Sequence, residues 1–383
     1  MLKKLLLIIC ISLLLSPAAI NAQNTAEESF LNQTEDLASP IQNIFPAEVV
    51  KILEEQETSG QDGKPFKQQN LELKGLEGEL KDKTILVEGI GAPESTLKNI
   101  YRVGDRVSIQ ATADENGNTA YFITDYIRTG SLKWLAIIFV IFLLAVGRWK
   151  GLRSLISLAL SFFVIMKYIL PQIMGGADPV ITTLFGSFAI LLVVIYLTEG
   201  FNRKAHVAVF SILLSLIATI IISYIFVNLT RLTGLADEEA SFLVGFGNQI
   251  INFKGLLLAG IIIGALGVLD DTVISQITAV EEIKSTSSGI SKTEVFKRAM
   301  NIGVSHISAM TNTLFLAYAG ASLPLLILFL SGQSAFSSAT QALNNEALAT
   351  EIVRTLTGSI GLILSMPLTT LFSVWWVGGR KAG

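Results

Sequence analysis

The sequence is poor in the side chains that bind metals and carry redox chemistry, with one cysteine and two histidines among 383 residues. The cysteine, Cys10, lies in an apolar N-terminal run, and a chain that loses this run can form neither disulfides nor thiolate metal sites. No HExxH, P-loop or GxSxG motif and no cluster of cysteine with histidine occurs. The sequence therefore predicts no catalytic site, no metal site and no cofactor, and an enzyme is not expected.

Charged residues are also scarce, at 15 % of the chain, with a formal net charge of −3. No stripe of basic residues interleaved with aromatics is present, which argues against nucleic-acid binding. Hydrophobic residues make up 51 % of the chain, and several apolar runs approach the roughly 20 residues that cross a bilayer. This composition predicts a polytopic α-helical membrane protein in contact with the lipid bilayer.

The N-terminus has the pattern of a secretory signal. Lys3 and Lys4 precede an apolar core, and small residues ending at Ala22 form a cleavage site. Residues 1–22 are therefore predicted to be a signal peptide, with an uncleaved anchor as the alternative. The polar and acidic residues 23–44 that follow are predicted to be a linker.

Residues 45–130 predict a small β-rich domain outside the cytoplasm. Five short runs, such as AEVVKILEE and DRVSIQAT, alternate apolar and polar residues, and turns containing Gly, Asp or Asn separate them. Five such strands favour a small barrel of OB-like or SH3-like type. This domain is either a compact cap or a module that binds a protein partner.

Residues 131–383 predict a bundle of seven membrane-spanning helices. The apolar runs that define them are Leu132–Gly147, Leu152–Met174, Val180–Thr198, Val207–Val227, Gly255–Asp270, Ile302–Leu330 and Leu356–Val377. Lysine and arginine gather in alternate loops, around Lys150, Lys204 and Lys292, and Arg380 follows the last span. The positive-inside rule then places the mature N-terminus outside and the C-terminus inside the cell.

Two spans carry residues that interrupt a helix. Gly320–Pro324 falls within the sixth span and Pro367 within the last, and proline removes a backbone hydrogen bond. Before the sixth span, Ser291 and Glu294 have the spacing of a capping box, which predicts a helix start.

The fifth span carries a stripe of glycines that ends in carboxylates. Gly260, Gly264, Gly267 and Asp271 share one helix face. Small residues allow close helix approach in lipid, so this face is expected to pack against a neighbouring helix and to place Asp271 inside the bundle. Asp270 and Thr272 flank it on either side.

The sixth span carries a polar stripe at the same spacing, formed by Asn301, Ser305, Ser308 and Asn312, with His306 beside it. Polar groups at membrane depth are costly unless they meet one another or water. We therefore expect the two stripes to meet and to line a path for a substrate or ion. The residues of this predicted path are Asp270, Asp271, Thr272, Asn301, Ser305, His306 and Asn312. The alternative is that these groups only hold helices together through hydrogen bonds.

Three segments resemble the YibE/YibF-like family of bacterial multi-spanning membrane proteins. They are GRWKGLRSLISL at Gly147–Leu158, the triplet Asp270-Asp271-Thr272, and KRAMNIGVSHISAMTNTLFLAYAGASLP at Lys297–Pro324. The resemblance implies a multi-pass protein of the bacterial cytoplasmic membrane and leaves its activity open. A fainter, local likeness links the segment from Asp271 to Gly320 with the SecD/SecF branch of the resistance-nodulation-division transporters.

Two functions are compatible with these features. The first is a transporter or permease with a polar path through the membrane. The second is a non-transporting scaffold or assembly factor whose extracytoplasmic domain binds a partner protein. The substrate and the oligomeric state stay open at this point.

Overall fold

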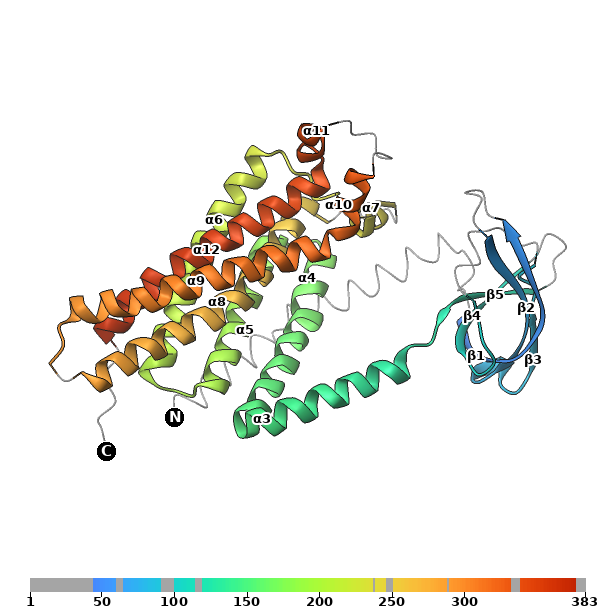
Figure 1. The fold of residues 1–383 in the computed structure, drawn as a ribbon, viewed down its shortest axis with the longest axis horizontal. Coiled ribbons are helices and arrows are strands. Elements are labelled where there is room, and N and C mark those ends of the chain that lie inside the picture. Colours follow the sequence, from blue (N-terminus) through green and yellow to red (C-terminus); the bar gives the residue numbers. More distant parts are fainter. Residues whose placement is uncertain are drawn as a thin grey trace. The chain divides into compact units, whose positions relative to one another are not determined.

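The structure of the chain is a computed structural model. It describes residues 44–59, 65–90, 100–113, 119–236, 238–245, 251–287, 289–331 and 338–376. The predicted signal peptide and residues 23–43 of the predicted linker lie outside these ranges. The described residues form two compact units, one ending at Val146 and the other beginning at Gly147. Figure 1 shows both units, and each is considered by itself.

The first unit is built on a five-stranded antiparallel sheet. Its strands are β1 (Ile44–Ser59), β2 (Pro65–Gly75), β3 (Thr84–Val87), β4 (Arg106–Ala113) and β5 (Thr119–Tyr126), and a 3-10 turn, η1 (Gly78–Leu80), follows β2. Alternate residues of these strands form the core, where Val49, Leu73, Val107 and Ile109 are fully buried. The five predicted strands are therefore confirmed.

The predicted closed barrel is wrong, because the strands form an open sheet in the order β3-β2-β1-β4-β5. The long strand β1 pairs with β4 through its first residues and with β2 through the rest. Two irregularities in the pairing of β1 with β2, after Val49 and after Ile52, increase the local twist. The sheet is thus curled without a hydrogen-bonded closure between β3 and β5 (Figure 1).

The second unit is helical, and α3 leads into it from the first unit. The helices are α3 (Thr129–Val164), the π-helical turn η3 (Ile165–Ile169), α4 (Leu170–Met174), α5 (Pro179–Thr198), α6 (Arg203–Leu229), α7 (Glu238–Gly245), α8 (Phe253–Thr286), α9 (Lys292–Ala321), α10 (Leu323–Leu330), α11 (Ala339–Leu343) and α12 (Glu346–Trp376). Helix α8 packs against α5, α6, α9 and α12. Figure 1 shows α8, α9 and α12 running side by side.

Five helices in the described part of the chain are long and apolar enough to cross a membrane, or six if the bent pair α9 and α10 forms one span. The predicted number of seven spans is not confirmed. Two of them, Leu132–Gly147 and Leu152–Met174, fall within one helical stretch of 46 residues, Thr129–Met174. Such a stretch would measure about 69 Å, more than twice the ~30 Å hydrocarbon core of a bilayer.

The long stretch is broken at Arg148, whose backbone has φ 48° and ψ −128°. A left-handed backbone costs an L-residue about 1–2 kcal/mol, so the surrounding structure must favour this break. It lies in the basic segment that the sequence assigned to a loop between two spans. Further along, η3 accommodates Pro171, which has no N–H to continue the helical bonding pattern.

Other predicted helix boundaries agree with the structure. The Ser291 side chain accepts a hydrogen bond from the N–H of Glu294 at 3.2 Å and begins α9. The predicted interruption of the sixth span is confirmed as a 65° bend at Ser322, where α9 ends and α10 begins. By contrast, the predicted interruption of the last span at Pro367 is wrong, because Pro367 lies inside α12, which continues past it to Trp376.

Helices α6 and α12 approach each other along two rows of small side chains. The row on α6 is Ser211, Ser215, Thr219 and Ser223, and the row on α12 is Gly361, Ser365, Thr369 and Ser373, all of them buried. A Cβ added at Gly361 would collide with Oγ1 of Thr219. Small residues at every fourth position let two backbones approach closely in lipid. The α6–α12 pair therefore depends on the absence of side-chain volume at these positions.

A single buried amide joins three helices in the same region. Nε2 of Gln276, on α8, donates to the carbonyl of Ala299 on α9 at 3.0 Å and to Oγ1 of Thr370 on α12 at 2.7 Å. Gly303 leaves room for it, because a Cβ there would lie 3.1 Å from Oε1 of Gln276. A satisfied polar group of this kind fixes the register of the three helices.

We predict that Gly361→Ala destabilises the bundle by about 1–3 kcal/mol, because the added methyl group meets Thr219. Thermal unfolding of the purified protein in detergent measures the effect. Gly358→Ala is the matched control, since nothing lies within 4 Å of a Cβ at Gly358, and it should be neutral or stabilising through helix propensity. Adding Thr219→Ala to Gly361→Ala should restore much of the loss. Equal effects at Gly358 and Gly361 would contradict the close approach.

Candidate functional site

The polar stripe of α9 lies on the exposed side of the helix. Its four residues are all exposed: Asn301, Ser305, Ser308 and Asn312. The buried residues of α9, among them Ala299 and Gly303, lie on the opposite face, which contacts α8 and α12. His306 is half-buried at the edge between these faces. The stripe therefore points away from the helices to which α9 is packed.

The glycine stripe of α8 is also largely exposed. Asp271 is exposed, and a Cβ at Gly260 or Gly267 would meet no atom of the described residues within 4 Å. Only Gly264 has a close neighbour, the hydroxyl of Tyr318, 3.1 Å from the position of an added Cβ. The prediction that this face packs along a neighbouring helix was wrong, because the buried side of α8 is the opposite, apolar one.

The two stripes are therefore not brought together within the described chain. Thr272 is buried but donates its hydroxyl to the carbonyl of Val268 at 2.9 Å, within α8 itself. This bond satisfies the hydroxyl inside its own helix. One of the seven predicted path residues, Asp270, lines a cleft of the bundle.

Asp270 lies in a cleft of about 190 Å³ between the end of α3, the turn η3, and helices α5 and α8. The rest of the lining is mostly aliphatic, and Ser161 is its other polar residue. Among the described residues, the carboxylate has no hydrogen-bond or ion-pair partner, and its charged neighbours, Asp271 and Glu199, are both acidic. Asp270 is near the midpoint of α8, about 25 Å from either end at 1.5 Å per residue.

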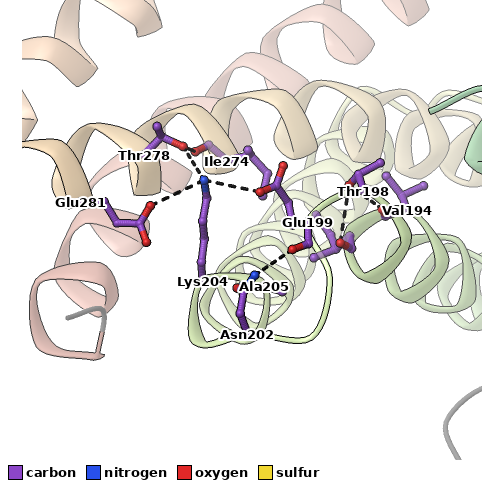
Figure 2. A network of polar contacts seen from close by, with 10 residues as sticks. Val194, Thr198, Glu199, Asn202, Lys204, Ala205, Ile274, Thr278 and Glu281 are labelled. Carbon is purple, nitrogen blue, oxygen red and sulfur yellow. Dashed lines mark hydrogen bonds and ion pairs between the residues drawn. The ribbon is translucent and has the colours of Figure 1, made fainter. Parts of the chain in front are cut away.

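A network of charged groups joins the end of α5 and the start of α6 to α8 (Figure 2). Nζ of Lys204, at the start of α6, donates to Oγ1 of Thr278 on α8 at 2.7 Å. It also lies 3.5 Å from Oε2 of Glu199, at the end of α5, and 3.8 Å from Oε2 of Glu281 on α8. We call these four residues the Lys204 network. Their ammonium and carboxylate groups are mostly shielded from solvent, since the three side chains are only 15 %, 19 % and 27 % exposed.

The short connection between α5 and α6 places Lys204 in this position. Gly200 has φ 78°, a conformation that an L side chain rarely adopts. The Asn202 side chain then caps α6 by accepting from the N–H of Ala205 at 2.8 Å, while its amide donates to the carbonyl of Glu199 at 2.7 Å. The turn thereby holds Glu199 and Lys204 on the side of α8.

On α8, the cleft and the network lie on the same face of the helix. On α8, Asp270, Ile274 and Thr278 follow one another at four-residue intervals, so Asp270 lies two turns from the network. On α5, Val194 of the cleft is five residues from Glu199, which is about 140° of helix rotation, so the two lie on different faces of that helix. The arrangement is an unpaired carboxylate at mid-helix, with a lysine between two further carboxylates about two turns further along α8.

The described residues contain no group of three or more His, Cys, Asp or Glu side chains arranged to hold a metal ion. The sequence did not single out the Lys204 network, because Lys204 was assigned to a basic loop and neither Glu199 nor Glu281 was among the site residues. Gln276 was also missed, although a lone amide in the middle of an apolar helix is a recognisable signal.

Long apolar helices joined to a small antiparallel sheet fit an α-helical membrane protein. The chain belongs to the family described as YibE/F-like protein, whose family model matches residues 135–379. The match confirms the resemblance seen in the sequence, and it begins within α3, so it covers the helical unit and leaves out the sheet. No curated protein and no solved structure matches the chain, and the local likeness to SecD/SecF is not supported.

We predict that Lys204→Met destabilises the bundle by about 1.5–3 kcal/mol, because Thr278 loses its charged hydrogen-bond donor and the carboxylates of Glu199 and Glu281 lose the cation between them. Thermal unfolding in detergent measures the loss. The control is Arg298→Met, which breaks an ion pair with Glu294 whose side chains are 55 % and 44 % exposed and should cost under about 1 kcal/mol. If both variants unfold alike, the Lys204 network is no more than a surface ion pair.

Proposed function

We propose that the chain is a transport protein of the bacterial cytoplasmic membrane and that Asp270 is the group that binds the transported proton or cation. The single observation that carries the proposal is the position of Asp270, an unpaired carboxylate in an otherwise apolar cleft at the middle of a membrane-spanning helix. Ionisable groups at membrane depth are costly to keep and typically mark ion pathways. Asp270 thus replaces Asp271 as the central residue of the path predicted from the sequence.

The Lys204 network gives the path a polar end. Lys204 sits between two carboxylates, so the three charged groups have a net charge of −1 and attract cations toward the cleft. Its hydrogen bond to Thr278 connects α6 with α8. A shift of the ammonium from one carboxylate to the other would change how α5 and α8 are held together at this end.

The orientation follows from the positive-inside rule. The end of the bundle that carries the network also carries Arg203 and Lys204 at the start of α6, and Lys292, Lys297 and Arg298 in the first turns of α9. In the proposed orientation this end faces the cytoplasm and the sheet lies outside. The cleft would then exchange protons or cations with the cytoplasm through the network.

The second candidate is a scaffold whose sheet recruits a partner protein. The open sheet favours it, because the edge strands β3 and β5 each pair on one side only in the described structure. Unpaired edges accept an added strand from another chain. Leu86 on β3 is 59 % exposed, which adds an apolar contact at that edge. Removing residues 23–128 should abolish the function of a scaffold and leave ion flux through the bundle intact.

The test of the transport proposal is potential-driven proton flux into liposomes that contain the purified full-length protein and a trapped pH-sensitive dye. A potassium gradient with valinomycin supplies the potential. We predict that Asp270→Asn lowers the flux to that of protein-free liposomes, because the amide cannot take up and release a proton at neutral pH. Asp271→Asn is the matched control, since this adjacent carboxylate is exposed and outside the cleft, and it should retain the wild-type flux.

Carbodiimide labelling gives a second readout on the same variants. A hydrophobic carbodiimide reacts with protonated carboxyl groups in apolar surroundings, so mass spectrometry should find the label on Asp270 and not on Asp271. Equal flux in wild type and Asp270→Asn, with no label on Asp270, would refute the transport proposal and leave the scaffold as the better candidate.

A further inference from the structure

The exposed stripe of α9 has the spacing of a helix-packing seam. Asn301, Ser305, Ser308 and Asn312 are separated by four, three and four residues, the alternation by which one helix meets another in a left-handed pair. Helix α9 already uses its other face for α8 and α12. The seam is therefore a second packing face that no described helix of the same unit covers.

The surroundings of this seam are apolar. Ile302 and Val304 are 50 % and 58 % exposed, and Phe315 and Leu316 are 61 % and 67 % exposed. These side chains flank the stripe on both sides, so its amides and hydroxyls lie in a surface that otherwise suits lipid. Polar groups left facing lipid tails lose their hydrogen bonds to water, and a partner that restores those bonds would stabilise this face.

Hydrogen bonds within α9 do not satisfy the polar side chains of the stripe. The hydroxyl of Ser305 lies 3.5 Å from the carbonyl of Asn301, at the limit of a hydrogen bond. Among the described residues, the side-chain amides of Asn301 and Asn312 have no hydrogen-bond partner. Each amide offers two N–H donors and an accepting oxygen, so the most polar groups of the stripe are those without bonds.

We infer that the α9 stripe is a dimer interface and that its occupant is the same stripe of a second copy of this chain. Asparagine and serine both donate and accept hydrogen bonds, so identical stripes are complementary when they meet about a two-fold axis normal to the membrane. Asn301 then faces Asn301 of the partner subunit, and Asn312 faces the partner subunit's Asn312. The span at Leu132–Gly147 is too apolar to satisfy these amides.

Other partners for the α9 stripe would give different assemblies. The exposed stripe of α8 would pair Asp271 with an asparagine of another copy in a head-to-tail arrangement, which does not close as a dimer by itself. An unrelated membrane protein would leave the chain monomeric after purification. The small size of Ser305 and Ser308 favours the symmetric pair, because it lets two α9 backbones approach closely at the centre of the seam.

Cysteine cross-linking of the full-length chain in native membranes tests this interface. The starting variant is Cys10→Ser, into which Asn301→Cys, Ser308→Cys or Asn312→Cys is introduced one at a time. Copper phenanthroline should convert each of them into a covalent dimer. Ile302→Cys, rotated by about 100° on the same helix, and Ile221→Cys, exposed on α6, are the controls and should stay largely monomeric.

A second measurement does not depend on cysteine reactivity. Asn301→Leu together with Asn312→Leu should weaken dimerisation in liposomes about tenfold to several hundredfold, since losing one interhelical hydrogen bond in a membrane costs about threefold to twentyfold and two amide pairs are lost. Energy transfer between labelled copies measures the change. Ile302→Leu is the conservative control. The inference is overturned if the stripe variants cross-link no more than Ile221→Cys, or if Asn301→Cys couples only to a co-expressed Asp271→Cys. Unchanged association of the double leucine variant would overturn it as well.

Discussion

The close approach of α6, α8 and α12 is the constraint on which the helical unit depends. Lipid tails are as apolar as leucine, so membrane helices gain little from burying aliphatic surface against one another. Here the stability comes from small hydroxyl side chains and from Gly361 against Thr219, with the Gln276 amide setting the register. Helix α5 packs against α6 and α8, and α9 packs against α8 and α12.

The α5 side of α8 is less tightly packed than its α6 and α12 sides. With the core of α8 fixed against α6 and α12, its α5 side is joined at the Lys204 network and opens at the Asp270 cleft. Its remaining side, with Asp271, is exposed. With α8 held against α6 and α12, a small change in the Lys204 network could alter the Asp270 cleft about two turns away.

Much of the fold could be predicted from the sequence, because strand alternation and long apolar runs are local signals. The five strands, the start of α9 at Ser291 and the break before Pro324 all follow from residues close in the chain. The closure of the sheet could not be predicted, since it depends on how β1 divides its pairing between β2 and β4. For the site, spacing identified the stripes of α8 and α9 correctly but not which side faces the bundle. Asp270, one residue from the favoured Asp271, is turned toward the cleft by a rotation of 100° per residue.

The backbone break at Arg148 coincides with the boundary between the two units. The described residues up to Val146 and those from Gly147 onward each form a compact unit of their own. The two parts should therefore tolerate synthesis as independent polypeptides, and an exchange of the sheet-bearing part between relatives would leave the helical machinery unaltered. Such modularity would let one helical unit be joined to different β-sheet units.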